Sequence, residues 1–155
     1  MSHLASDEVY ARLRALELFK GMGEKEIRSL AELAEEVEFS AGTVIFTECE
    51  PATHCYLIVT GHVVLEICDP DKCSPISTVG PGELLGWTTV LGGGRLTATA
   101  RCQEPTRAIE LPGPELIALC ESNPVVGYQL MKCVAQTLAG RLTATRLQLL
   151  DLYSR

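Results

Sequence analysis

The first 35 residues carry apolar side chains at intervals of three and four positions, a period that predicts two amphipathic helices. The first is expected over residues 6–18, and its apolar face, which extends one residue beyond it, is formed by Val9, Leu13, Leu16 and Phe19. Ser6 and Asp7 are its N-cap candidates, because short polar side chains accept hydrogen bonds from the first free amides of a helix. Two glycines then break the pattern, and a second helix is expected over residues 24–35.

From about residue 36 the apolar period falls to two, which predicts short β-strands. Seven such runs are bounded by Gly, Pro or Asp, at residues 37–39, 43–46, 56–59, 63–67, 76–79, 96–100 and 108–111. No segment between them has the pattern of a crossover helix, so antiparallel sheets are expected. The chain is therefore predicted to be a single α+β domain over residues 1–155, with helices at 6–35, an antiparallel β-roll (a jelly-roll barrel) at 36–111 and C-terminal helices at 112–153.

The helical period returns after the last strand. A short helix is expected over residues 115–120, and Pro124 begins a long one, since proline is favoured at the first helical position. Small or apolar residues then alternate in steps of four and three: Met131, Ala135, Leu138, Leu142, Thr145, Leu149 and Leu152. This heptad seam would run for roughly 40 Å. We expect it to form a homodimer; the alternative is a helix that only covers the β-roll.

Composition and charge narrow the classes of partner. The 155 residues include 13 basic and 20 acidic side chains, for a net charge of −7. Nucleic-acid backbones select clustered positive charge, so no nucleic-acid partner is expected. No apolar run approaches the roughly 20 residues of a membrane span, and the N-terminus lacks the features of a signal peptide. We expect a cytoplasmic protein without membrane contact.

The seven cysteines are an odd number without secretory context, which argues against a disulfide framework. Cys102, Cys120 and Cys133 are expected as small buried apolar residues. Cys68 and Cys73 flank a turn and would face each other across a hairpin. We expect two reduced thiols there, with a disulfide or a metal half-site as alternatives. Otherwise no metal site is predicted, and no histidine stands at a spacing that would indicate an enzyme.

Residues 82–101, GELLGWTTVLGGGRLTATAR, combine three consecutive glycines with an arginine and several threonines. Glycines allow backbone amides to approach a ligand closely, and an arginine adds a cation. This stretch therefore predicts a phosphate-binding loop within the β-roll.

Five further segments are specific as an ordered set: residues 41–46, 56–63, 79–86, 106–111 and 141–142. With the opening helices and the long final helix, they resemble the cyclic-nucleotide-binding domain, which is the sensor module of the catabolite activator protein family and of cyclic-nucleotide-gated channels and kinases. The resemblance runs from about residue 13 to residue 150. It implies a β-roll with a short helix in its phosphate loop and a cyclic nucleotide, cAMP or cGMP, as candidate ligand. It also implies a final helix whose packing responds to that ligand.

The resemblance assigns the ligand site to Gly86, Trp87, Thr88, Thr89, Arg95, Leu96, Thr97, Ala98 and, on the last helix, Thr145. Three positions depart from the family pattern. Trp87 stands where the family's nucleotide binders carry a ribose-binding carboxylate, and would either stack on a ligand or fill the ribose pocket. Arg95 comes one residue too early, and would either turn back into the pocket or lie in solvent. Cys49 replaces a usual glycine.

The expected function is a regulatory sensor that binds a cyclic nucleotide or related anion and signals through its C-terminal helix. Its expected partners are a small-molecule ligand, a second copy of the chain and another protein. Because the sequence ends soon after the final helix, we expect no DNA-binding domain. One alternative is a fold that no longer binds nucleotide and serves in protein interaction or dimerisation. The other is a cysteine-based redox or metal sensor.

Overall fold

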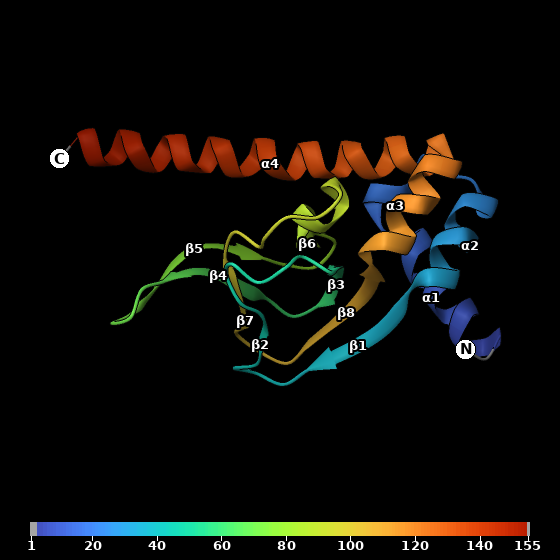
Figure 1. The fold of residues 1–155 in the computed structure, drawn as a ribbon, viewed down its shortest axis with the longest axis horizontal. Coiled ribbons are helices and arrows are strands. Elements are labelled where there is room, and N and C mark those ends of the chain that lie inside the picture. The colour runs from blue at the N-terminus through green and yellow to red at the C-terminus, as the bar shows by residue number, and fades with distance from the viewer. Residues whose placement is uncertain (1–2, 155) are drawn as a thin grey trace.

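The computed structural model describes residues 3–154, and places two sheets beneath one long helix, with the shorter helices gathered near the start of that helix (Figure 1). The helices are α1 (His3–Ala15), η1 (Glu17–Phe19), α2 (Glu24–Leu33), η2 (Trp87–Leu91), α3 (Gly113–Ser122) and α4 (Pro124–Tyr153). The strands are β1 (Glu35–Phe39), β2 (Val44–Phe46), β3 (His54–Thr60), β4 (Val63–Cys68), β5 (Cys73–Val79), β6 (Leu84–Leu85), β7 (Thr99–Cys102) and β8 (Thr106–Pro112).

The strands form two four-stranded antiparallel sheets, in the orders β1-β8-β3-β6 and β2-β7-β4-β5. The predicted α+β β-roll with flanking helices is therefore confirmed. Within β3 the side chains alternate between two cores: Leu57 packs with the helices, and its neighbour Ile58 packs inside the roll. That alternation follows from the two-residue period of a strand. Both side chains are fully buried, which fixes how the helices sit against the first sheet.

Most strand limits differ from the predicted runs by one to three residues, and two departures lie next to the predicted phosphate loop. The two-residue strand β6 was not predicted, because so short a run has no readable period. The run predicted to start at Leu96 becomes strand only from Thr99. Leu96 instead pairs with a loop, since its amide donates to the carbonyl of Glu50 and its carbonyl accepts from the amide of Cys49, both at 2.9 Å.

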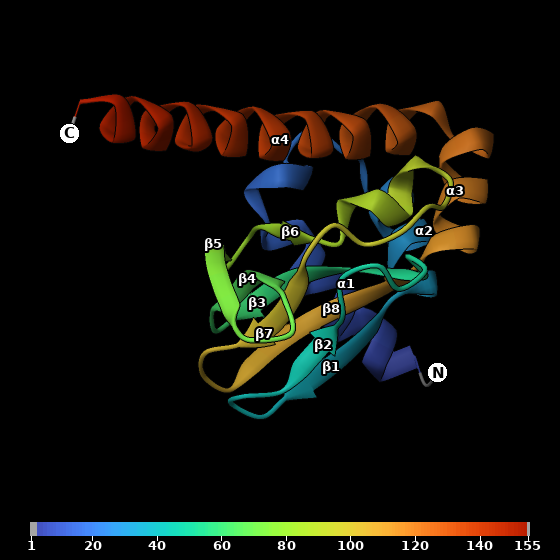
Figure 2. The ribbon, with the colours of Figure 1, turned by 60° about the vertical axis from the view of Figure 1, so that its left-hand side comes forward.

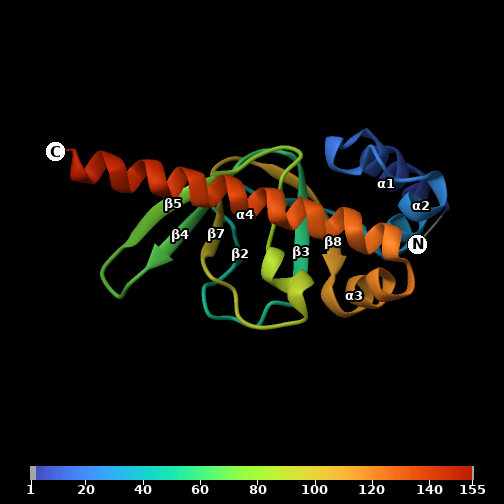
Figure 3. The same ribbon diagram turned by 90° about the horizontal axis from the view of Figure 1, so that it is seen from above.

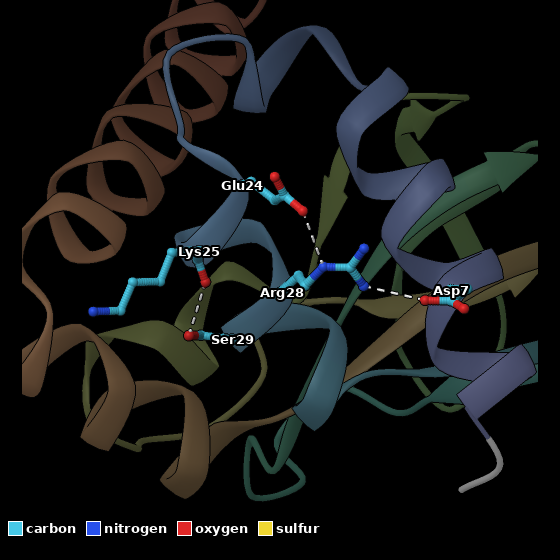
Figure 4. Close-up of polar contacts among 5 residues, drawn as sticks. All are labelled: Asp7, Glu24, Lys25, Arg28 and Ser29. Atoms are coloured by element: carbon cyan, nitrogen blue, oxygen red, sulfur yellow. Dashed lines mark hydrogen bonds and ion pairs between the residues drawn. The ribbon is translucent and has the colours of Figure 1, made fainter.

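The N-cap prediction for the first helix is wrong, because α1 already begins at His3. Asp7 has another role, which Figure 4 shows: its carboxylate accepts a hydrogen bond of 3.1 Å from the Arg28 guanidinium of α2. Arg28 also donates to Glu24 at 3.4 Å and stacks over the ring of Tyr10. The hydroxyl of the next residue, Ser29, donates to the carbonyl of Lys25, one turn earlier in the same helix. Arg28 thus ties α1 to α2.

The helix α4 begins at Pro124 as predicted, and Asn123 caps it by accepting from the amides of Val125 and Val126. Only its first third packs into the helical core. Its later part passes over the β-roll, and its C-terminal end continues beyond the sheets (Figures 1 and 3). The outer seam positions are open to solvent, with Leu142 53% and Leu152 66% exposed. Among residues 3–154, no helix combines the length and the apolar character needed to cross a membrane.

Candidate functional site

A small cavity lies where the predicted phosphate loop meets α4. It is lined by Phe46, Leu65, Leu85, Gly86, Trp87, Thr88, Leu96, Thr97, Ala98 and Arg141. Its volume is about 20 Å³. One water molecule needs roughly 10–15 Å³ on this kind of measure, whereas small-molecule sites are usually about 300–1,000 Å³. In this conformation the site is therefore closed.

The turn into η2 depends on Gly86. Its φ of 81° lies in the left-handed region, and a Cβ atom there would be 3.1 Å from the carbonyl oxygen of His54. Glycine is thus required both by the backbone angle and by the space. Next to this turn, the buried hydroxyl of Thr89 donates to the same His54 carbonyl at 2.9 Å. Thr89 therefore fastens η2 to β3 and does not line the cavity.

Trp87 occupies the position after the turn, where the family pattern has a carboxylate that this chain lacks. Its ring is partly buried, packs against the helical core and lines the cavity. In Figure 2 the segment that carries it, η2, lies beneath α4 and beside α3. The bulk of the indole contributes to closing the space, which is one of the two roles expected for this residue.

Arg95 lies outside the cavity. Its side chain is exposed, and its guanidinium donates to the carbonyl of Cys49 at 2.8 Å. The cause is backbone pairing: Arg95 forms a bridge with Pro51. The next residue, Leu96, is buried and lines the cavity. Because neighbours on an extended chain point to opposite sides, Arg95 points to solvent.

Arg141 of α4 lines the cavity instead. Its side chain is half-buried and makes no hydrogen bond or ion pair with any residue that the structure describes. Burial lowers the pKa of its guanidinium, and the carboxylate of Glu83 partly offsets this effect. An arginine keeps its charge under these conditions, so the cavity contains a cation that Glu83 compensates only in part.

Thr145, the predicted base-contacting residue, lies one turn further along α4. It is exposed, and its hydroxyl donates to the Arg141 carbonyl of its own helix at 2.9 Å. A spacing of four residues places the two side chains on the same face of a helix. That spacing is the sequence signal that could have found Arg141.

The structure brings together six of the nine predicted ligand-site residues: Gly86, Trp87, Thr88, Leu96, Thr97 and Ala98. The other three, Thr89, Arg95 and Thr145, do not line the cavity in this conformation. Sequence reasoning missed the apolar walls and the cation, which are Phe46, Leu65, Leu85 and Arg141.

Cysteines fall into two groups. Cys68 and Cys73 form a disulfide across the β4–β5 hairpin, so the expectation of two reduced thiols is wrong and the disulfide alternative holds. Cys102 and Cys133 are buried as predicted. Burial also raises the pKa of Cys133 to about 11, and Cys120 is half-buried. These thiols stay protonated near neutral pH and are poor nucleophiles.

A β-roll that carries a glycine-turned short helix, with its cavity covered by a long helix, defines the class of the protein: a ligand-sensor fold. The comparisons identify the family. The cyclic nucleotide-binding domain family matches residues 36–123, and the chain belongs to that family.

Relatives agree with this assignment. The chain is 29% identical over 147 residues to a CRP-like cAMP-activated global transcriptional regulator of Mycobacterium tuberculosis, covering 94% of this chain and 62% of that protein. It thus spans less than two thirds of that curated relative. Among solved structures it is similar to a candidate cyclic nucleotide-binding protein from Geobacter metallireducens, with a TM-score of 0.76, 30% identity and coverage of 85% of this chain and 96% of the other. The N-terminal domain of a transcriptional regulator from Streptomyces coelicolor gives a TM-score of 0.67 at 27% identity, covering 86% of this chain and 94% of that one.

Proposed function

We propose that this chain is a regulatory sensor that accepts an anionic ligand in the β-roll cavity and transmits its presence through α4. The observation that carries the proposal is Arg141, a half-buried cation at the cavity that makes no hydrogen bond or ion pair among residues 3–154 and whose charge the carboxylate of Glu83 compensates only in part. Burying a charge is unfavourable unless an opposite charge or hydrogen bonds compensate it. An anion next to Arg141 supplies that compensation.

The ligand that fits the family is a cyclic nucleotide, and two threonines beside Arg141 offer hydroxyl donors to its phosphate. These are Thr88 on η2 and the exposed Thr97, which both line the cavity. Entry of a nucleotide requires Trp87 and α4 to move outward, because the closed cavity has a volume of only about 20 Å³. The ribose loses the carboxylate that the family pattern supplies. One charged hydrogen bond contributes about 1.5–3 kcal/mol, so affinity is expected to be about 10- to 150-fold weaker than with that carboxylate.

Signalling follows from the position of Arg141. A ligand held by η2 and Arg141 joins the β-roll to α4, so its binding favours one placement of the helix over others. The exposed seam of α4, which includes Leu142 and Leu149, is the surface through which we propose that two copies dimerise. A protein partner that reads the dimer is the proposed output.

Isothermal titration with cAMP and with cGMP tests this proposal. We expect binding that Arg141→Gln weakens by about tenfold or more, in line with the loss of a charged hydrogen bond. Arg146→Gln is the matched control, because Arg146 is an exposed arginine of the same helix that does not line the cavity. Equal affinities of the two variants would contradict the role of Arg141. Absence of heat with both nucleotides at millimolar concentration would exclude them as ligands.

A second candidate function is a fold retained for protein interaction or dimerisation without nucleotide binding. The closed cavity and the bulk of Trp87 favour it. It predicts the same thermal stability with and without nucleotide. Trp87→Ala separates the candidates: a sensor that Trp87 merely obstructs gains affinity when the indole is removed, whereas a module without a ligand still binds nothing.

A further inference from the structure

The β4–β5 hairpin carries two cysteines at its tip, on the part of the roll that projects away from the shorter helices (Figures 1 and 3). Cys68 and Cys73 are paired directly across the two strands, with a Cα–Cα distance of 4.0 Å. The turn between them is held by its own hydrogen bonds. The carboxylate of Asp69 accepts from the amides of Asp71 and Lys72 at 2.8 and 2.9 Å, and the Asp69 amide donates to the Lys72 carbonyl at 2.9 Å. The two sulfurs therefore stay close together without the disulfide.

A third ligand atom lies beside them. Glu66 precedes Cys68 by two residues on β4, so both side chains project from the same face of the strand. An oxygen of Glu66 lies 3.9 Å from the Cys68 sulfur, and one ligand atom from each of the three residues lies within 4.8 Å of the others. The other carboxylate oxygen of Glu66 is 3.5 Å from the Arg101 guanidinium, which orients the group.

These distances suit a tetrahedral metal ion. Thiolates bind zinc at about 2.3 Å, so two ligands of a tetrahedral zinc lie roughly 3.8 Å apart. A carboxylate oxygen binds zinc at about 2.0–2.2 Å, so an oxygen ligand and a sulfur ligand lie roughly 3.6 Å apart. The 3.9 Å between Glu66 and Cys68 is close to that value. Four residues separate the two cysteines in the sequence, which is within the spacing of paired cysteines in zinc sites. Cys73 is exposed, so an ion and a water molecule can reach the site.

We propose that the reduced hairpin binds a zinc-like divalent cation through Cys68, Cys73 and Glu66, with water as the fourth ligand. Oxidation by an external disulfide, which is itself reduced to a dithiol, converts both thiolates into the disulfide found in the structure and closes the site. The hairpin would thus couple metal occupancy to redox state, at a place separate from the cavity under α4.

An external dithiol supplies the two electrons that reduce the Cys68–Cys73 disulfide. One thiolate of the dithiol attacks the exposed Cys73 sulfur, the disulfide bond breaks, and Cys68 leaves as a thiolate that takes up a proton. The second thiolate of the dithiol then displaces Cys73, which is protonated in turn, while the dithiol becomes a disulfide. The metal ion binds the two sulfurs as thiolates and releases those two protons.

Titration of the full chain with Co²⁺, followed by displacement with Zn²⁺, tests the proposal. The protein is reduced with a dithiol, which is removed without oxygen before the titration. Reduced protein is expected to bind one Co²⁺ per chain with a thiolate-to-cobalt charge-transfer absorption that Zn²⁺ abolishes. Oxidised protein is expected to show none, a comparison that needs no mutation.

Three variants locate the ligands. Cys73→Ser should lose the absorption, and Glu66→Gln should bind at least about tenfold more weakly, the lower range for damage to a metal site. Cys49→Ser is the matched control, because Cys49 is the other exposed cysteine and lies outside the hairpin. The proposal is overturned if reduced protein shows no thiolate absorption, or if Cys73→Ser binds like the unmodified chain. It is equally overturned if Glu66→Gln has no effect, or if Cys49→Ser abolishes binding.

Discussion

Replacement of Cys49 by glycine is expected to stabilise the fold. Its φ of 71° is the only positive value of a non-glycine residue within residues 3–154, and its side chain is exposed. A left-handed conformation costs a residue with a Cβ atom roughly 1–2 kcal/mol. Glycine removes this cost, but it also makes the unfolded chain more flexible, which lowers the free energy of unfolding by about 0.4–1 kcal/mol. The difference between the midpoints of the two ranges is a net gain of about 0.8 kcal/mol in the free energy of unfolding for Cys49→Gly.

Thermal and urea unfolding at a fixed redox state measure this gain. A gain of that size should raise Tm by about 2–3 °C in a chain of this length. Cys49→Ala is the control: it removes the thiol but keeps the Cβ atom, and should leave Tm close to its original value. The carbonyl of Cys49 still accepts from Arg95 in both variants, so that contact cancels. The reasoning fails if Cys49→Gly is no more stable than Cys49→Ala.

Three other predictions follow from single features. Gly86→Ala should cost about 1–2 kcal/mol for its left-handed angle, and more than Gly82→Ala. Gly82 has φ 82° but no atom within 4 Å of an added Cβ, whereas Gly86 has the His54 carbonyl at 3.1 Å; urea unfolding compares the two. In sedimentation, Leu142→Glu on the seam should dissociate the proposed dimer, while Leu147→Glu, exposed but off the seam, should leave it intact. Burial raises the pKa of Cys55 from 9.0 to about 12, so its contribution to stability is complete below pH 9 and is lost as pH rises toward 12, at up to about 1.4 kcal/mol per pH unit. Cys55→Ala should reduce that slope in urea unfolding, and an unchanged slope would contradict the assignment.

The fold was predictable because it is encoded in local periods. Apolar residues spaced by three and four marked the helices, and the change to a period of two at about residue 36 marked the roll. Short features escaped because they depend on partners far away in the sequence. The segment at Leu96 left the predicted strand only because it pairs with the loop around Glu50.

The sequence predicted the loop residues of the candidate site, but not the arginine that carries its positive charge. Gly86 and Thr97, which the resemblance assigned to the ligand site, both line the cavity. The direction of Arg95 is decided by its pairing with Pro51, which the sequence does not reveal. Nor does the sequence show which residue of a long helix faces the roll, and this is why Thr145 was chosen and Arg141 was not.

Under the proposal, Arg141 of α4 and not Arg95 of the β-roll contacts the anion, and this difference changes how ligand binding affects the helix. A cation on the β-roll would hold a ligand against the roll, and the helix would respond only through secondary contacts. A cation on α4 makes the ligand itself a link between the roll and the helix, so the free energy of that ion pair enters directly into the placement of the helix. Truncating Arg141 should therefore lower ligand affinity and also abolish the effect of saturating ligand on dimerisation. Truncating a roll residue such as Thr97 should lower affinity, while saturating ligand still shifts the dimer equilibrium.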